Sequence, residues 1–288
     1  RYSYCLNNPL KYTDPDGEIV WFVPILIGAA IFGTGNLAAH AIKGDVNSFG
    51  DGLKYFGQGA LVGAALGAAW QFAPLIPGIG QGIQTGMNIY GAVHLGGAAV
   101  STVSGLGQGI FTGDWNALGN AGKIFLGNFN LDENRSFFGG VWQGVSRHTW
   151  EFIQTGLGHS IGQLRNTFGG IDDVDYFGGA TLMNSDDNSG EMWGFTLGSF
   201  INSKNLDVED EMFRHEYGHT LQGQRWGVLY PFAIGIPSAI SSNFSSNEKH
   251  RNRWYEKGAN RYGERYYRKY LPNNLTLTPW DDIRYPRH

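Results

Sequence analysis

A long uncharged stretch constrains this chain more than any other feature of its sequence. Residues 55–113 contain no Asp, Glu, Lys or Arg, which makes 59 uncharged residues in a row in a chain that is 16% charged. Glycine makes up 15 of these 59 residues. Such a run indicates either helices packed closely against one another or helices that enter a membrane.

The spacing of the glycines favours close helix packing. Small residues at every fourth position lie on one helical face and let two backbones approach each other. Two sets have this spacing, Gly59, Gly63 and Gly67, and Gly78, Gly82 and Gly86. Pro74 and Pro77 interrupt the run, and the mean hydropathy of the chain is only −0.25. We therefore expect a Gly-rich, mainly helical region at 18–168, with membrane insertion of residues 19–113 as the alternative.

The sequence His215-Glu216-Tyr217-Gly218-His219 has the pattern H-E-x-x-H. On a helix, residues four apart lie one turn apart on one face, so both imidazoles can bind one metal ion. Glu216 then projects beside the metal, where it can accept a proton from a bound water. Acidic residues before the motif and an apolar stripe within it predict a helix over 207–226.

A catalytic zinc site of this kind needs a third protein ligand. Glu256, 37 residues after His219, is our first candidate, and His250 is the rival. Asn260 follows Glu256 by four residues on the same helical face, so its side-chain oxygen could accept the N–H of a ligating histidine. His250, Tyr255 or Tyr230 could instead donate a hydrogen bond to the oxyanion of a tetrahedral intermediate, and the spacing does not choose among them.

H-E-x-x-H followed by a later E-x-x-A-N resembles the gluzincin branch of the zinc metallopeptidases. The resemblance implies Zn²⁺ held by His215, His219 and Glu256, with Glu216 as general base and Asn260 supporting a histidine. Many gluzincins have Asp where this chain has Asn260, which weakens the charge on the supported histidine but keeps the hydrogen bond.

Residues 1–17 resemble the end of the core of bacterial RHS-repeat proteins, through the pattern R-Y-x-Y-x-x-N-N-P-L-x-Y-x-D-P-x-G. A longer pattern, H-E-Y-G-H-T-L-Q at 215–222, I-P-S at 236–238 and W-Y-E at 254–256 with Asn260, is similar to C-terminal domains of such proteins, and this resemblance covers residues 170–270. The resemblance implies a toxin enclosed by the RHS core of a parent protein, with Asp14 as a candidate for that family's self-cleavage element. It also implies a cognate immunity protein as partner.

The region from 169 onward changes character. Strand-like patterns at 179–183 and 195–201 flank the turn-rich residues 184–190, whereas 114–168 predict further helices with an amphipathic segment at 142–153. We therefore expect an α+β fold with a zincin-like domain at 169–288, in which an edge strand can align an extended peptide.

Composition excludes several other classes of protein. The single cysteine, Cys5, excludes an internal disulfide and a thiolate zinc site. A net charge of −4 predicts no nucleic-acid partner, and we interpret the basic residues at 249–269 as the exposed side of a helix packed through its aromatic residues. No signal peptide is visible, so we expect export to depend on something outside these residues, consistent with delivery into target cells by a type VI-like secretion system.

The sequence thus predicts a zinc-dependent peptide-bond hydrolase that acts on a protein or peptide as a secreted toxin. Glu216 would take the proton of the zinc-bound water and return it to the leaving amine. The alternatives are a toxin that inserts residues 19–113 into a membrane, and a catalytically inactive zincin-like binding domain.

Overall fold

The computed structural model describes residues 22–186, 189–271 and 277–288. The motif at 1–17, including Asp14, lies outside these residues. The chain divides into two compact units, Arg1–Ile89 and Tyr90–His288, and each is considered by itself.

The first unit contains a hairpin of two helices, α1 (Val23–Lys43) and α2 (Phe49–Phe72), followed by a short 3₁₀ turn at Ala73–Leu75. Gly44 ends α1 with a φ of +85°, a conformation that glycine adopts without a steric cost. Ser48 begins α2, because its hydroxyl accepts a hydrogen bond from the backbone N–H of Asp51 at 3.1 Å.

The first glycine set packs as its spacing predicts. A Cβ atom on Gly63 would lie 1.9 Å from the carbonyl oxygen of Gly28 on α1, and Gly59 and Gly67 meet the α1 backbone at similar distances. Only glycine permits this approach. In contrast, no atom of the described residues beyond the local chain lies within 4 Å of a Cβ placed on Gly78, Gly82 or Gly86. Close packing is therefore confirmed for the first set and wrong for the second.

Two helices are long and apolar enough to cross a membrane by length and composition, namely α1 and α3 (Gly80–Thr112). Core helices of soluble proteins pass the same test, but only 28% of the apolar window in α1 and 17% of that in α3 is buried. Membrane insertion therefore stays a prediction.

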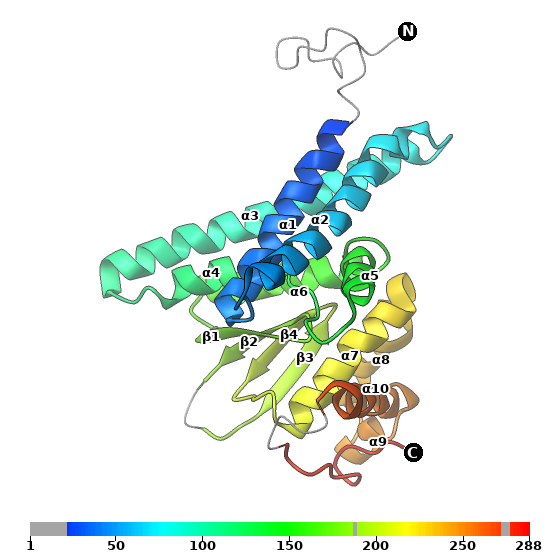
Figure 1. The fold of residues 1–288 in the computed structure, drawn as a ribbon. Helices are drawn as coiled ribbons and strands as arrows, with labels where there is room; N and C mark the ends of the chain where they lie inside the picture. The colour runs from blue at the N-terminus through cyan, green and yellow to red at the C-terminus, as the bar shows by residue number, and fades with distance from the viewer. Residues whose placement is uncertain (1–21, 187–188, 272–276) are drawn as a thin grey trace, which may run out of the picture. The chain divides into compact units, whose positions relative to one another are not determined.

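The second unit contains a mixed four-stranded sheet between two layers of helices (Figure 1). Helices α4 and α6 contact one face of the sheet, and α7 contacts the other, with α10 packed against α7. This arrangement establishes the α+β class. The helices are α4 (Asn116–Leu126), α5 (Phe137–His148), α6 (Phe152–Thr167), α7 (Glu211–Trp226), α8 (Ile236–Phe244), α9 (Asn247–Arg251) and α10 (Trp254–Tyr270).

The strands are β1 (Asp173–Phe177), β2 (Ala180–Ser185), β3 (Trp193–Leu197) and β4 (Phe200–Lys204), in the order β1-β2-β4-β3. The strands β2 and β4 are parallel, and the other neighbours are antiparallel. The strand predicted at 179–183 corresponds to β2. The single strand predicted at 195–201 is wrong, because Gly198, with a φ of +61°, turns the chain there and makes a β3–β4 hairpin. Since β3 is at an edge, no strand among the described residues pairs with its outer side.

The predicted amphipathic segment at 142–153 is also not one helix. It is broken after His148, and α6 begins at Phe152. The intervening turn lets the Trp150 indole donate a hydrogen bond to the carbonyl of Gln224 on α7 at 3.0 Å. A tertiary contact thus ends α5 where its sequence alone would continue it.

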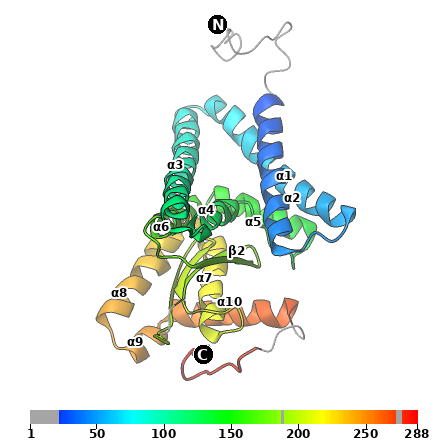
Figure 2. The ribbon, with the colours of Figure 1, turned by 90° about the vertical axis from the view of Figure 1, so that its left-hand side faces the viewer.

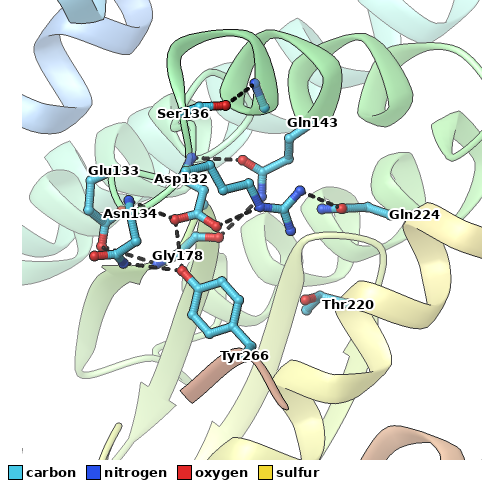
Figure 3. Close-up of polar contacts among 12 residues, drawn as sticks. Asp132, Glu133, Asn134, Ser136, Gln143, Gly178, Thr220, Gln224 and Tyr266 are labelled. Carbon is cyan, nitrogen blue, oxygen red and sulfur yellow. Dashed lines mark hydrogen bonds and ion pairs between the residues drawn. The ribbon is translucent and has the colours of Figure 1, made fainter. Parts of the chain in front are cut away.

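A polar network joins the loop between α4 and α5 to the helices on the other face of the sheet (Figure 3). The buried carboxylate of Asp132 accepts hydrogen bonds from Tyr266 of α10 at 2.7 Å and from the side chain of Arg135 at 2.8 Å. Arg135 also donates to Gln224 of α7 at 3.0 Å. The compact unit that contains α7 and α10 therefore begins well before the boundary expected at 168/169.

Candidate metal centre

The H-E-x-x-H motif lies on α7, which spans Glu211–Trp226 of the helix predicted at 207–226. The residues before it form a turn instead, in which the Asp210 carboxylate accepts a hydrogen bond from the backbone N–H of Asp207 at 2.8 Å. Helical geometry places His215 and His219 one turn apart, with their ring centroids separated by 4.8 Å.

Glycines bring the third candidate ligand to these histidines. A Cβ on Gly218 of α7 would lie 2.0 Å from the carbonyl oxygen of Ala259, and one on Gly263 of α10 would lie 2.1 Å from that of Arg214. The two helices are therefore in backbone contact at these positions. This contact places Glu256, in the first turn of α10, beside the two imidazoles.

The ligand atoms of His215, His219 and Glu256 all lie within 4.8 Å of one another and could hold a metal ion. One carboxylate oxygen of Glu256, Oε2, lies 3.2 Å from Nε2 of His215 and 3.2 Å from Nε2 of His219. The Glu256 side chain is 2% exposed, so these groups meet in a largely dehydrated position. Two imidazole nitrogens and one carboxylate oxygen are a donor set suited to a catalytic zinc ion.

The partners of the other imidazole nitrogens show that these residues fit a metal. Nδ1 of His215 lies 2.7 Å from Oδ1 of Asn260, and Nδ1 of His219 lies 2.8 Å from Oε1 of Gln222. Both partner atoms accept hydrogen bonds, so in the neutral rings they hold the proton on Nδ1 and leave the lone pair of Nε2 directed toward Glu256. Asn260 thus has the position expected for it.

Gln222 is a further contact that the sequence analysis did not assign to the site. Its amide nitrogen donates to the carbonyl of Tyr255 at 2.7 Å, which fixes the orientation of the amide that supports His219. The signal was present in the sequence, since Gln222 follows His219 by three residues on the same helical face.

The second oxygen of Glu256 is held by the segment between α7 and α10. Ser238 of α8 donates a hydrogen bond to Oε1 at 2.6 Å, and Nε2 of His250 lies 3.8 Å from the same oxygen. Figure 2 shows α8 and α9 to one side of α7 and α10. His250, the rival third ligand, faces the carboxylate oxygen directed away from the histidines, and its Nδ1 is 2.7 Å from the hydroxyl oxygen of Ser241. The structure therefore groups Glu256, not His250, with the two histidines.

Glu216 is 6% exposed and lies against the edge strand β3. The hydroxyl of Thr196 donates to Oε2 of Glu216 at 2.7 Å and also lies 3.0 Å from the backbone carbonyl oxygen of Glu216. A Cβ on Gly194 would lie 2.9 Å from Cγ of Glu216, so glycine at this position leaves room for the carboxylate. Thr196 and Gly194 were not predicted, because they approach Glu216 only through the fold.

The candidate oxyanion donors differ in their surroundings. Tyr230 is buried, with its ring centroid 6.5 Å from that of His219; burial and the charges of Glu216 and Glu256 raise its pKa well above the ordinary value. Tyr255 instead directs its hydroxyl to the carbonyl of Pro237 at 3.1 Å and to Ser241 at 3.0 Å. The ring of Tyr230 thus lies near that of His219, whereas the hydroxyl of Tyr255 contacts α8.

The charges of the site are strongly coupled. Burial lowers the pKa of His215, but the Glu256 carboxylate outweighs this effect and raises that pKa to about 9. Burial raises the pKa of Glu256, but the neighbouring imidazoles, chiefly His219, lower it well below its usual range. A cation bound by these groups would therefore displace a proton from His215.

No protein-family model, curated protein or solved structure matches this chain. A functional assignment therefore depends on the site geometry and on the chemistry of its residues.

Proposed function

We propose that the chain is a zinc-dependent peptide-bond hydrolase of the gluzincin-like kind. The observation that supports this proposal most directly is the convergence of two Nε2 atoms and one carboxylate oxygen beside a glutamate on the same helix. A bound Zn²⁺ supplies Lewis acidity, since it lowers the pKa of a coordinated water and polarises a carbonyl.

In the proposed hydrolysis, each residue of the site has a separate role. His215, His219 and Glu256 hold the cation, and Glu216 accepts a proton and later returns it to the leaving amine. Thr196 orients the Glu216 carboxylate through its hydrogen bond. The unpaired edge of β3 offers backbone N–H and C=O groups to an extended peptide, and Tyr230 is our candidate for donation to the oxyanion.

The toxin role is proposed from the resemblance of residues 1–17 to the end of an RHS core. In this proposal the RHS core encloses the chain until it is delivered into a target cell. A cognate immunity protein then protects the producing cell.

Substitution of the general base tests the hydrolase proposal. We expect Glu216→Gln to keep one zinc per chain and to lower peptide hydrolysis by about 10³-fold, because the amide keeps the shape of the side chain but cannot accept the proton. Zinc content and cleavage of a peptide library would be measured beside the matched variant Glu248→Gln, which changes an exposed glutamate on α9. The proposal would be contradicted if neither variant held zinc. It would also be contradicted if Glu216→Gln hydrolysed peptides and killed target cells as well as the unchanged chain.

A membrane-active toxin is the second candidate, and the exposed apolar windows of α1 and α3 favour it. It predicts leakage of dye from liposomes that is as strong with Glu216→Gln as with the unchanged chain. Leakage abolished by that single substitution, or no leakage from either protein, would exclude it.

A further inference from the structure

Residues 277–288 form a strap along α7 and α10, and they are not part of the H-E-x-x-H motif or of its predicted partners. The carbonyl of Thr278 accepts a hydrogen bond from Arg214 of α7, and the backbone N–H of Asp281 donates to the carboxylate of Glu211. At its other end, the carbonyl of Arg287 accepts from Arg261 of α10 at 2.8 Å. The strap is thus held by both helices that carry the candidate ligands.

The centre of the strap lies against His215. The ring of Tyr285 is 6% exposed, and its centroid is 5.7 Å from that of the His215 imidazole. The Trp280 indole donates to the carbonyl of Tyr285 at 2.9 Å, and the backbone N–H of Tyr285 donates to the carbonyl of Asp281 at 2.7 Å. These contacts fold the strap into a compact turn that presents the next carbonyl, that of Pro286, to α10.

Asn260 connects this carbonyl to the candidate metal ligand. Its Oδ1 lies 2.7 Å from Nδ1 of His215, and its Nδ2 donates to the carbonyl oxygen of Pro286 at 2.7 Å. A carbonyl oxygen can only accept, so the atom that faces Pro286 must be a donor. The strap therefore selects the amide orientation in which the oxygen faces His215, and that orientation keeps the proton on Nδ1 and leaves Nε2 free for a metal.

The same contact accounts for an amide at a position where many gluzincins have a carboxylate. An ionised aspartate accepts hydrogen bonds but cannot donate one. At position 260 it would support His215 but would set a charged oxygen against the Pro286 carbonyl at a distance suited to a hydrogen bond. An amide satisfies both neighbours at once.

We propose that the strap, through Pro286 and Asn260, is a positioning element for His215, so that metal affinity depends on its contact with α10. The inference rests on the proposed zinc site. It predicts a specific coupling between residue 260 and the strap, and general stabilisation of the fold by the strap would not produce that coupling.

A double-mutant cycle read by metal affinity tests the inference. The four proteins are the unchanged chain, Asn260→Asp, a chain ending at Arg284, and that shorter chain with Asn260→Asp. Competition with a chromogenic chelator would give the Zn²⁺ dissociation constant of each, and the visible spectrum of bound Co²⁺ would report the ligand geometry. Ile283→Ala, which changes a 92% exposed residue of the strap, is the matched control.

We expect the shorter chain to bind Zn²⁺ about 10-fold more weakly than the unchanged chain, because Asn260 loses its orienting partner. Asn260→Asp should weaken binding in the unchanged chain, where the carboxylate meets the Pro286 carbonyl. It should strengthen binding several-fold in the shorter chain, where that carbonyl is gone and the added negative charge supports His215. Asn260→Asp should thus change the Zn²⁺ affinity in opposite directions in the unchanged chain and in the shorter chain.

Equal effects of Asn260→Asp in both backgrounds, or unchanged affinity in the shorter chain, would overturn the inference. If the shorter chain does not fold, as judged by circular dichroism, Arg287→Ala replaces it, because Arg287 anchors the strap to Glu264 of α10 at 3.3 Å. If the unchanged chain binds no Zn²⁺, the proposed function fails. If it binds Zn²⁺ without this coupling, only the role of the strap fails.

Discussion

The two oxygens of the Glu256 carboxylate have different neighbours. Oε2 faces the histidines, whereas Oε1 accepts a hydrogen bond from Ser238 at 2.6 Å. A monodentate carboxylate ligand that loses such a bond is free to rotate away from its metal. The orientation of the third candidate ligand therefore depends on a hydroxyl of α8, a helix that supplies no candidate ligand itself.

This dependence predicts the behaviour of Ser238→Ala. We expect Zn²⁺ to dissociate from this variant at about 10-fold lower chelator concentration than from the unchanged chain. Ser242→Ala is the control, because Ser242 is an exposed residue of the same helix and its hydroxyl donates to the carbonyl of Ala239 within α8. Similar metal affinities for both variants would show that Ser238 does not support the ligand.

The sequence could predict some residues of the site and not others for a physical reason. His215, Glu216 and His219 follow from one helical period, and Asn260 follows Glu256 by the same period. Thr196, Ser238 and Tyr285 approach the site from β3, α8 and the strap, so no local spacing relates them to it. Periodicity predicts contacts within a helix, but the packing of separate elements decides the rest.

At the scale of elements, alanine substitutions in the two glycine sets should have opposite effects on the free energy of unfolding, although the two sets have the same spacing. A methyl group on Gly63 would collide with the Gly28 carbonyl at 1.9 Å, so α1 and α2 must separate. We expect Gly63→Ala to lower the free energy of unfolding by about 2 kcal/mol. Gly82→Ala should raise it by about 0.5 kcal/mol, because alanine favours the helix and no described residue outside the local helix lies within 4 Å of the added Cβ.

Urea unfolding followed by circular dichroism would measure both effects. A stabilised Gly63→Ala variant would contradict the observed helix contact. A Gly82→Ala variant as unstable as Gly63→Ala would indicate that the second glycine set also packs against another segment.

The elements also show where a local pattern is insufficient. The apolar alternation over 195–201 continues through Gly198, yet the chain turns there and pairs Leu197 with Phe200. Likewise, the helical pattern continues through Trp150, which instead turns toward Gln224 of α7. In both places the segment gains tertiary contacts that are not encoded in its own periodicity.

At the scale of the whole molecule, the change in composition near residue 169 marks the start of the sheet rather than the start of a compact unit. The fully buried guanidinium of Arg147 on α5 donates to the carbonyls of Gly127, Asn128 and Asn130 before that point, and to the carbonyl of Gly179 after it. A buried charge with these partners is costly to remove. Helices that precede 169 therefore belong to the same compact unit as the candidate metal centre.

Buried histidines in these helices give the second unit a dependence on pH. Burial lowers the pKa of His159 to about 3, and burial together with the Arg147 charge lowers that of His148 to about 3. A histidine whose folded pKa lies below its ordinary value of 6.5 stabilises the fold fully above pH 6.5 and less as the pH falls toward 3. Lowering the pH from 7 to 5 should therefore lower the free energy of unfolding by about 2 kcal/mol for each of the two histidines.

Glu151 acts in the opposite direction within the same unit. Burial raises its pKa to about 7, from an ordinary value of 4.5. A carboxyl with a raised folded pKa stabilises the fold fully below pH 4.5, and this contribution is lost as the pH rises through 7. Acidification from pH 7 to pH 5 should therefore raise the free energy of unfolding by about 2 kcal/mol through Glu151. This gain offsets the loss caused by one of the histidines.

Two substitutions separate these opposing contributions. We expect His159→Gln to lose about 2 kcal/mol less stability than the unchanged chain between pH 7 and pH 5, because it removes a group that must stay neutral in the fold. Glu151→Gln should lose about 2 kcal/mol more over the same interval, because the stabilisation gained on protonation is absent. Urea unfolding at pH 7, 6 and 5 would measure both slopes. Parallel slopes for the two variants would contradict the opposite pKa shifts that burial gives these two side chains.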